Sequence, residues 1–398
     1  MTAADPVPPA LEGIRIIDLT STFMGPYATM LLARMGADVI KVETPDGDVV
    51  RHIGRGRNPG MGPIFLAANH GKRSIALDLK HPEGRRALDS LLATADVFVT
   101  NLRPAALDRL GLTAEALLAA HPRLVFATLP GFGSAGPYRD RAAYDDVIQA
   151  ASGLAAVQGG TGEPGYVRTV VADKAVGLLG LGAITAALLG VARTGRGRAV
   201  EVPMFESMVE FFLLEQQNGR VLDPPTGPTG YSRTSSPNRK PYATADGHLG
   251  VVVYTDRQWL SFFDLIGRPE LAREERFATI TARTENIDEL YGLLAETLPS
   301  RTTDEWLAAL GAAGIPAQPV LTSDDLLDDP HLAAVGLFEP LEHPSEGRLV
   351  LPRLPVIVDG ASAPPVRGAP RLGEHGAEVL AEAGWDAAEI AMLGLRPM

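Results

Sequence analysis

Asp173 is the residue whose type and place in the sequence most directly suggest covalent chemistry. It stands just before an uncharged, apolar segment of 18 residues, 175–192, which predicts a helix. An aspartate at this position can cap the helix by accepting hydrogen bonds from first-turn amides. Alternatively, the same amides would keep the carboxylate ionised, and an ionised carboxylate can attack an electrophilic carbonyl and form a covalent intermediate. The residue types alone do not choose between a cap and a nucleophile.

Positively charged side chains gather in a few predicted loops, several of them at or just after strand ends. These residues are Lys72, Arg73, Lys80, Arg103, Arg109, Arg139 and Arg141. Open parallel sheets bind ligands in a crevice outside the strand ends. A single surface Lys or Arg usually serves only to solvate the protein. The shared location of these residues in an acidic chain nevertheless favours a small phosphorylated ligand.

Other candidate sites are weaker. A glycine-rich segment, 131–137 (GFGSAGP), follows a predicted strand, and its backbone could approach a ligand. It lacks the G-x-G-x-x-G spacing of a dinucleotide site, so a simple turn is the alternative. His70, His121 and His331 lie in loop-like sequence, where a solvated side chain is expected. The sequence contains no P-loop, H-E-x-x-H or G-x-S-x-G motif, and we expect no metal site.

Alternating strands and helices must position these candidates. The pattern predicts buried strands at 14–19, 38–43, 74–79, 96–100 and 124–129, and helices at 26–35, 82–93 and 107–120. The strands are nearly all apolar, as in a parallel sheet covered on both faces by helices. The predicted fold class is therefore α/β.

A change of composition near residue 222 indicates a second domain. Residues 223–230 (DPPTGPTG) cannot form a helix or a central strand, so we expect a linker there. The sequence beyond it predicts a short strand at 250–254 and helices at 259–266, 287–298 and 303–313. These elements suit a smaller, mixed domain.

The composition narrows the partners and the location. The 398-residue chain is 45% hydrophobic and 21% charged, with a formal net charge of -12. Such an acidic surface argues against nucleic acid and membrane lipid as partners. The absence of cysteine excludes disulfides and fits a cytoplasmic location, and residues 1–9 lack the features of a signal peptide. Segment 175–192 approaches the length of a membrane span, but its glycines favour a buried, closely packed helix.

A series of segments in a fixed order carries a family resemblance. They are 11–18 (LEGIRIID), Gly25-Pro26, 35–43 (MGADVIKVE), 69–80 (NHGKRSIALDLK), 101–111 (NLRPAALDRLG), 144–153 (YDDVIQAASG), Asp173 and 194–202 (TGRGRAVEV). Together they resemble the class III, or CaiB/BaiF-type, CoA-transferase family, which includes formyl-CoA:oxalate transferase, carnitine CoA-transferase and the α-methylacyl-CoA racemases. The likeness covers most of residues 11–215 and continues in outline through Asp246-Gly247 and 283–286.

The resemblance implies a reaction and a set of site residues. Asp173 would attack an acyl-CoA thioester to give an aspartyl acyl anhydride, and the released thiolate would form an aspartyl-CoA thioester. An acceptor carboxylate would then take the CoA through a second anhydride. Acyl-CoA and a carboxylic acid are the implied substrates, with no tightly bound cofactor. The implied CoA-binding residues are Phe23, Leu77, Asp78, Leu79, Lys80, Asn101, Leu102, Arg103, Arg109, Arg141, Tyr144 and Asp145.

The resemblance also implies an architecture. We expect a Rossmann-like large domain with a parallel sheet, formed by residues 1–222 and 331–398, and a smaller α+β domain at 223–330. In this family two chains interlock to form a homodimer.

Two departures bear on the reaction. Phe23 replaces a glutamine of formyl-CoA:oxalate transferase, and a phenyl ring cannot hydrogen-bond a small diacid, which argues against oxalate and formate. The tetraglycine lid of that enzyme is also absent. The alternative function is that of an α-methylacyl-CoA racemase, which exchanges the α-proton with a histidine in a Gly-His-Asp motif. The matching stretch is Ala143-Tyr144-Asp145, and tyrosine, with an ordinary pKa near 10, is a poor base at neutral pH.

Overall fold

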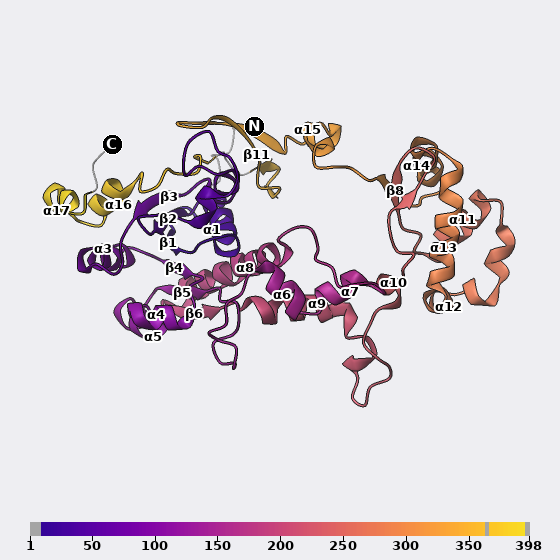
Figure 1. Cartoon of the computed structure of the whole chain (residues 1–398), viewed down its shortest axis with the longest axis horizontal. Helices are drawn as coiled ribbons and strands as arrows, with labels where there is room; N and C mark the ends of the chain where they lie inside the picture. Colours follow the sequence, from indigo (N-terminus) through magenta and orange to yellow (C-terminus); the bar gives the residue numbers. More distant parts are fainter. Residues whose placement is uncertain (1–8, 363–365, 395–398) are drawn as a thin grey trace. The chain divides into compact units, whose positions relative to one another are not determined.

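A parallel β-sheet forms the centre of the first compact unit of the chain (Figure 1). The computed structural model describes residues 9–362 and 366–394. Within them, six strands run in the order β3-β2-β1-β4-β5-β6, each parallel to its neighbours. Their bounds are β1 Arg15–Leu19, β2 Asp38–Glu43, β3 Arg73–Ala76, β4 Val97–Thr100, β5 Val125–Thr128 and β6 Arg198–Glu201. The strand order reverses between β1 and β4, and open α/β sheets bind ligands outside the carboxyl ends of the strands at such a point.

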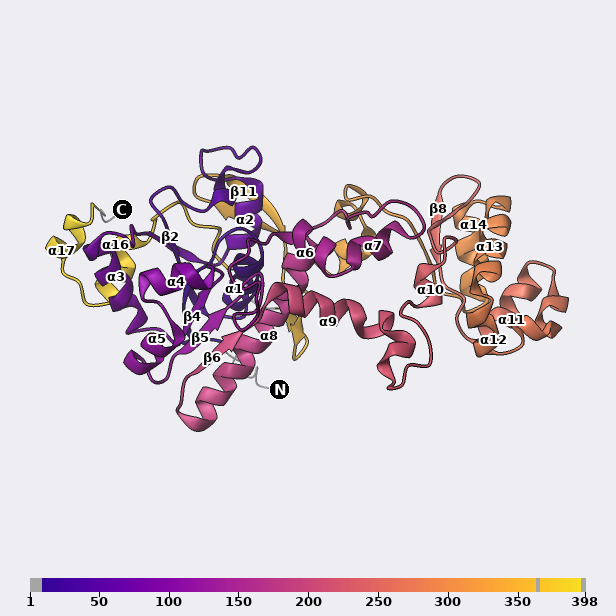
Figure 2. The ribbon, with the colours of Figure 1, turned by 60° about the horizontal axis from the view of Figure 1, so that its bottom comes forward.

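Helices cover both faces of this sheet (Figure 2). On one face, α3, α4, α5 and α16 bury apolar side chains such as Leu88, Leu107 and Val379 in a common core with Ile17 and Phe98 of the sheet. On the other face, α1 and α8 pack against each other. The helices of this unit are α1 Met24–Arg34, α2 Pro63–Asn69, α3 Pro82–Leu92, α4 Pro104–Leu110, α5 Ala114–Ala120, α6 Asp145–Ala151, α8 Val171–Thr194, α16 Gly376–Glu382 and α17 Ala387–Met392.

In the first unit the elements predicted between residues 14 and 129 agree with these bounds to within two residues, except in two places. The strand predicted at 38–43 is confirmed residue for residue as β2. The single helix predicted at 107–120 is wrong, because Gly111 takes a left-handed φ of 61° and ends α4, and Thr113 then caps a separate helix, α5. The strand predicted at 74–79 ends at Ala76, and the following residues form a loop and a turn.

The second compact unit comprises residues Gly153–Tyr166 and Phe212–Leu332. A three-stranded antiparallel sheet, β7-β8-β9, packs with short helices around aromatic side chains that include Trp259, Phe262 and Trp306. The bounds are α7 Leu154–Gly159, α10 Ser232–Ser235, β7 Tyr242–Ala243, β8 His248–Val251, α11 Asp256–Leu265, α12 Ile280–Glu285, α13 Ile287–Thr297, α14 Thr303–Ala312 and β9 Ala317–Pro319. Capping boxes formed by Thr255 with Gln258 and by Thr302 with Glu305 start α11 and α14.

The compact units differ in extent from the predicted domains. The first unit contains residues Met1–Ser152, Val167–Phe211 and Ala333–Met398. The chain passes from the first unit to the second within α9, Met204–Gln216, rather than at residue 223, and returns within α15, Pro330–Ala334. Residues 223–230 form an irregular segment inside the second unit. The C-terminal part adds two hairpins to the first unit, β10 Phe338–His343 with β11 Gly347–Pro352 and β12 Ile357–Val358 with β13 Ala361–Ser362.

The apolar segment 175–192 lies within α8, which is the longest helix of the described residues. By length and composition α8 could cross a membrane, and 33% of its most apolar 18-residue window is buried. The expectation of a buried helix is therefore only partly correct. Leu178, Leu179 and Leu189 are each about half exposed, at 51%, 50% and 53%. The predicted absence of a signal peptide concerns residues 1–9, of which only Pro9 lies within the described residues.

Candidate active site

Asp173 lies in the first turn of α8, three residues after the helix N-cap, which is Val170. The interpretation of Asp173 as the cap is therefore wrong. The backbone amide of Met24, the first residue of α1, lies near the Asp173 carboxylate and favours the ionised form. The first-turn amides of a helix have no partner inside the helix, so they are available to an anion. The start of α1 thus faces the candidate nucleophile.

Close packing of α1 and α8 creates this contact. Gly177 follows Asp173 by one helical turn and faces the start of α1. A Cβ atom at Gly177 would lie 3.0 Å from the carbonyl oxygen of Met24 and 3.0 Å from Cδ1 of Tyr27. Only a glycine allows the two helices to approach this closely without a shift of α1. Gly177 is therefore part of the device that brings the Met24 amide to Asp173.

The electrostatic environment of Asp173 makes it a weaker acid than an ordinary aspartate. Burial and the neighbouring Asp145 raise its pKa from 3.8 to about 7, against the opposing effect of the Met24 amide. The expectation that helix amides keep this carboxylate fully ionised is therefore wrong at neutral pH, because desolvation and a like charge exceed the stabilisation by one amide. Such a carboxylate is more basic, and so more nucleophilic once ionised, than one in water.

Asp145 holds the backbone of the candidate nucleophile in place. It is 5% exposed, and its Oδ2 accepts a hydrogen bond of 3.0 Å from the backbone N–H of Asp173. Gln149, one turn further along α6, donates to Asp145 and accepts from the backbone N–H of Val167 at 2.9 Å. Asp145 is therefore placed to fix the start of α8. Tyr144, in contrast, is the N-cap residue of α6, but its side chain makes no capping hydrogen bond and is 68% exposed.

Two further candidates lie where the strand order reverses. Asn101 follows β4, and its side-chain amide both accepts from the Ser21 N–H at 3.1 Å and donates to the Ser21 carbonyl at 2.8 Å. This amide is thus engaged in holding the loop after β1. Phe23, at the end of that loop, packs against an apolar cluster that includes Val50, Met61 and Phe65. The ring of Phe23 is therefore part of a packed surface beside the start of α1.

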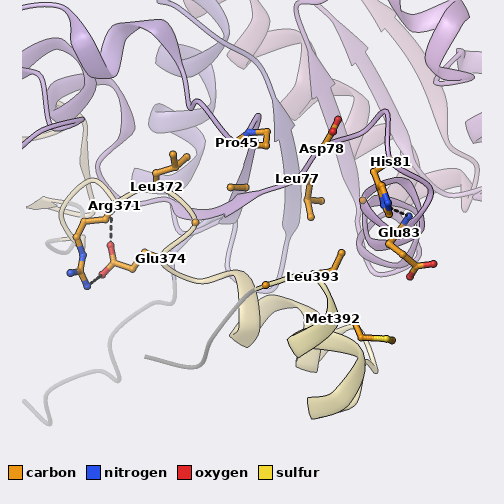
Figure 3. Close-up of a pocket in the computed structure, with 14 residues that line it drawn as sticks. Pro45, Leu77, Asp78, His81, Glu83, Arg371, Leu372, Glu374, Met392 and Leu393 are labelled. Atoms are coloured by element: carbon orange, nitrogen blue, oxygen red, sulfur yellow. Dashed lines mark hydrogen bonds and ion pairs between the residues drawn. The ribbon is translucent and has the colours of Figure 1, made fainter.

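A cavity of about 780 Å³ opens at the carboxyl end of β3 (Figure 3). Leu77 and Asp78 form one side of it, and Leu372 and Leu393 of the C-terminal segments form another. Leu77 is at the same time 3% exposed and part of the core under the sheet. Leu79 and Leu102, two more of the predicted contacts, also pack against that core. The structure therefore brings two predicted site residues, Leu77 and Asp78, into one cavity.

Exposed basic residues come together beyond β4 and β5. Arg103 Nη1 donates to the carbonyl of Asp140 at 3.4 Å, which joins the start of α4 to the loop that carries Arg139 and Arg141. The guanidinium of Arg141 lies 3.6 Å over the ring of Tyr138. Arg109 lies on α4 itself and is exposed, as is Lys80 after β3. These cations could contact the phosphates of an anionic ligand.

Some sequence-based interpretations of polar residues are wrong. Lys72 is fully buried and bonded to Asp18, and Arg73 is 5% exposed and paired with acidic side chains, so neither is available to a ligand. His70 is 5% exposed rather than solvated, and burial lowers its pKa to about 4. In the loop 131–137, the amides of Gly133 and Ser134 are bonded to carboxylates of Glu206 and Glu201, which favours the simple turn.

Sequence reasoning missed two participants. The Met24 amide has no side-chain signature, and its role appears only when α1 and α8 are packed together. Gly177 gave only a general signal of close packing in an apolar helix. Among residues 9–362 and 366–394, no group of three or more His, Cys, Asp or Glu side chains is arranged to hold a metal ion.

Known proteins are similar to this chain over nearly its whole length. A family model described as CoA-transferase family III matches residues 11–376. A succinate–glutarate CoA-transferase from Agrobacterium fabrum is 36% identical, with 94% of this chain and 96% of the relative aligned. A formyl-CoA:oxalate CoA-transferase from Streptomyces avermitilis is 35% identical, with 93% and 94% aligned. A crystal structure of a CAIB/BAIF family protein from Brucella suis has a TM-score of 0.79 and 33% identity, covering 95% of this chain and 100% of that one.

Proposed function

The chain belongs to CoA-transferase family III, and on this premise we propose that it moves coenzyme A from an acyl-CoA donor to a carboxylic acid acceptor, with Asp173 as the covalent nucleophile. The observation that carries the proposal is the setting of Asp173. A half-buried carboxylate with a raised pKa lies beside the first backbone amide of α1, and the backbone N–H of Asp173 is held by Asp145. This arrangement offers an activated anion next to a donor for a developing negative charge.

The first half of the reaction loads CoA onto the enzyme. The Asp173 carboxylate attacks the thioester carbonyl, the C–S bond breaks, and an aspartyl acyl anhydride forms with release of the CoA thiolate. The thiolate then attacks the aspartyl carbonyl of the anhydride and displaces the donor acid as a carboxylate. The product is an aspartyl-CoA thioester, so the CoA is covalently held while the donor acid leaves.

The second half reverses these steps with the acceptor. The acceptor carboxylate attacks the aspartyl thioester, the thiolate leaves, and a second anhydride forms. The thiolate then attacks the acceptor carbonyl, which yields the new acyl-CoA and regenerates the Asp173 carboxylate. Each attack places negative charge on a carbonyl oxygen. The Met24 amide is the donor best placed to stabilise the oxyanion when that oxygen belongs to Asp173.

The raised pKa suits this sequence of steps. A carboxylate with a pKa of about 7 is present in its ionised form in useful amounts at neutral pH. Because nucleophilic strength rises with basicity, it attacks a thioester more readily than an ordinary aspartate would. Asp173 is also less solvated than a surface carboxylate, so less water must be removed before the attack.

We propose that coenzyme A extends from Asp173 toward the cavity beside Leu77 and Asp78. The apolar walls formed by Leu77, Leu372 and Leu393 suit the flat base of the nucleotide end. The phosphates would contact exposed cations, which we assign among Lys80, Arg103, Arg109 and Arg141. In this assignment Asn101 and Phe23 shape the loop beside the nucleophile instead of binding the nucleotide.

The acceptor is a carboxylic acid, and the relatives indicate which acids to test first. The named substrates of the two relatives above include the dicarboxylates succinate, glutarate and oxalate. We propose a dicarboxylate longer than oxalate, because the apolar Phe23 beside the start of α1 offers no hydrogen bond to a very small diacid.

We also propose that a second copy of the chain covers α8. The exposed apolar side chains of Leu178, Leu179 and Leu189 are unfavourable in water, and burying them against another chain would recover about 25 cal/mol for each Å² of apolar surface. The family resemblance favours interlocked chains in this dimer.

Mass spectrometry of the intact protein tests the nucleophile. Incubation with an acyl-CoA donor should add the mass of CoA to the wild-type chain, and the adduct should disappear when a dicarboxylate acceptor is added. The Asp173→Asn variant should form no adduct and no new acyl-CoA, while Asp146→Asn, which changes an exposed neighbour of Asp145, should behave like the wild type. Turnover by Asp173→Asn at more than about one hundredth of the wild-type rate would exclude Asp173 as the nucleophile.

A further inference from the structure

We propose that the buried Lys41–Asp48 pair is a positioning device for the transfer reaction: it fixes the loop after β1, residues 20–24, and so places the Met24 amide on Asp173. This inference rests on the proposed function, since it assigns a role in that reaction to residues remote from the substrate. Lys41 and Asp48 have side chains that are 0% and 1% exposed, so they do not contact a ligand themselves.

The pair bonds directly to the backbone of the loop. Lys41 Nζ donates to the Thr20 carbonyl at 2.8 Å and to Asp48 Oδ2 at 2.9 Å. The other oxygen of Asp48 accepts from the Thr22 N–H at 3.1 Å. The two charged side chains thus hold successive parts of the same loop. Neither side chain could move without moving the backbone of Thr20 or Thr22.

A second buried pair holds the two ends of the loop. Asp18 Oδ1 accepts from the Thr20 N–H at 3.0 Å, and Lys72 Nζ donates to Asp18 Oδ2 and to the Pro26 carbonyl, each at 2.9 Å. Asp18 and Lys72 are both fully buried. Burial alone would raise the pKa of Asp18, but the ammonium groups of Lys72 and Lys41 hold it at about 2. The loop is therefore bracketed by charges that remain paired.

The loop backbone itself is strained, so it needs this support. Thr22 has a φ of 75°, a conformation that side chains other than glycine rarely adopt. Gly25 lies so close to Thr20 that a Cβ atom at Gly25 would be 2.4 Å from Cβ of Thr20. Such a conformation persists only where the surroundings over-determine it. In this loop Lys41 donates to the Thr20 carbonyl, Asp48 accepts from the Thr22 N–H, and Asn101 accepts from the Ser21 N–H, and these bonds provide that constraint.

The loop affects the candidate active site because its residues lead directly into the start of α1. Thr22 precedes Phe23, the N-cap of α1, and Met24, whose amide lies near the Asp173 carboxylate and lowers its pKa. If Thr22 relaxes, the Met24 amide moves, and the Asp173 carboxylate loses the donor that stabilises its charge. The groups packed against Asp173 are Asp145 of α6 and the uncharged first turn of α1; Lys174 on α8 bonds to Thr169 instead. Loss of the amide would therefore leave burial and Asp145 unopposed, and the pKa of Asp173 would rise.

Two variants test the proposal. Asp48→Asn keeps an acceptor for Thr22 but places an amide N–H against Lys41, whose charge is still compensated by Asp18 and Glu43. Thr22→Gly keeps the backbone N–H that donates to Asp48 and removes the left-handed strain, because glycine adopts a positive φ freely, so this variant should leave the loop in place. The matched control is Arg51→Gln, which breaks the equally buried Arg51–Glu43 pair but removes no bond to residues 20–24.

The measurements are the acid limb of kcat/KM against pH and the titration of Asp173 by 13C NMR, with its carboxyl signal identified by its loss in Asp173→Asn. In Asp48→Asn we expect kcat/KM to fall about tenfold or more and both midpoints to move up by about half a pH unit or more, whereas Thr22→Gly should leave both midpoints unchanged. Arg51→Gln should lower thermal stability and leave both midpoints unchanged. Unchanged midpoints in Asp48→Asn, or an equal shift in Thr22→Gly or Arg51→Gln, would overturn the proposal. A wild-type enzyme that moves no CoA would refute the transfer reaction, whereas the NMR titration would still test the loop.

Discussion

Replacing Asp145 with asparagine should move the pH dependence of the reaction to lower pH. Asp173 must be ionised to attack, so the wild-type kcat/KM should fall below a pH of about 7, the pKa of this carboxyl. Asp145 is one of the two causes that raise this pKa, the larger being burial. Removing the charge at 145 should therefore make Asp173 a stronger acid and extend activity toward acidic pH.

The size of the shift follows from the order of these causes. The pKa of Asp173 rises from 3.8 to about 7, and burial contributes more than Asp145. The variant should reverse less than half of this rise, so we expect the acid limb to move down by about one pH unit, equivalent to about 1.4 kcal/mol. The fall in kcat/KM at pH 8 should be small unless the loss of one hydrogen bond at Asp145 also displaces α8.

The same substitution should change the pH dependence of stability. A carboxyl with a raised native pKa binds its proton more tightly in the folded state, so its contribution to stability is complete below pH 3.8 and is lost as pH rises to about 7. This loss amounts to at most about 4 kcal/mol in the wild type, and the variant should lose about 1.4 kcal/mol less.

The assay pairs kcat/KM profiles between pH 5 and 9 with urea unfolding at both ends of that range. Asp146→Asn is the control, because it removes an exposed carboxylate from the next position of α6 and should leave both measurements unchanged. An acid limb that stays in place in Asp145→Asn, or that moves upward, would refute the assignment of Asp145 as the charge that tunes Asp173.

Two further predictions concern α8. Gly177→Ala should lower kcat and gain none of the roughly 0.5–1 kcal/mol that alanine usually adds in a helix interior, because its Cβ would press on Met24 and Tyr27; urea unfolding and turnover check this, and a more stable variant with full turnover would contradict the packing argument. Light scattering at micromolar concentration should give twice the mass of one chain, and Leu189→Glu should shift the protein toward monomer; a wild-type monomer with full activity would contradict the proposed dimer.

The sequence pattern was sufficient to predict the strands of the sheet, because a run of apolar residues within each strand indicates directly that the strand is buried. The segment that became β2 is apolar except for its charged ends and Lys41, and its limits were predicted correctly. Residues 107–120 show where such reasoning fails. The apolar spacing continues through Gly111 and Thr113, and only the left-handed glycine and the threonine cap divide the helix. A helix end of this kind depends on one or two residues. In a prediction from the sequence, the apolar periodicity of a long segment outweighs so short a signal.

The active site was predictable only in its most recognisable part. Asp173 was found through its place before an apolar helix and through family likeness, but its pKa depends on burial and on Asp145, which lies 28 residues earlier on another helix. The Met24 amide leaves no mark on the sequence, since every residue except proline has one. The role of Lys72, which supports the loop that carries this amide, was misinterpreted as contact with a ligand. The position of Lys72 next to a strand is the same whether its side chain points to solvent or to the buried Asp18.

This ambiguity has a physical origin that applies to the whole site. Charged residues within or near the ends of parallel strands can direct a charge outward to a substrate or inward to support a neighbouring loop, and both uses place the same residue type at the same position. Burial decides between them: Lys41, Lys72 and Asp48 are enclosed and bond to loop backbone, whereas Lys80 and Arg103 are exposed. A buried charge is expensive unless it is fully paired, so a cluster of them under a catalytic loop is best explained by the geometry that it enforces. The charges that support the reaction thus include several that no substrate touches.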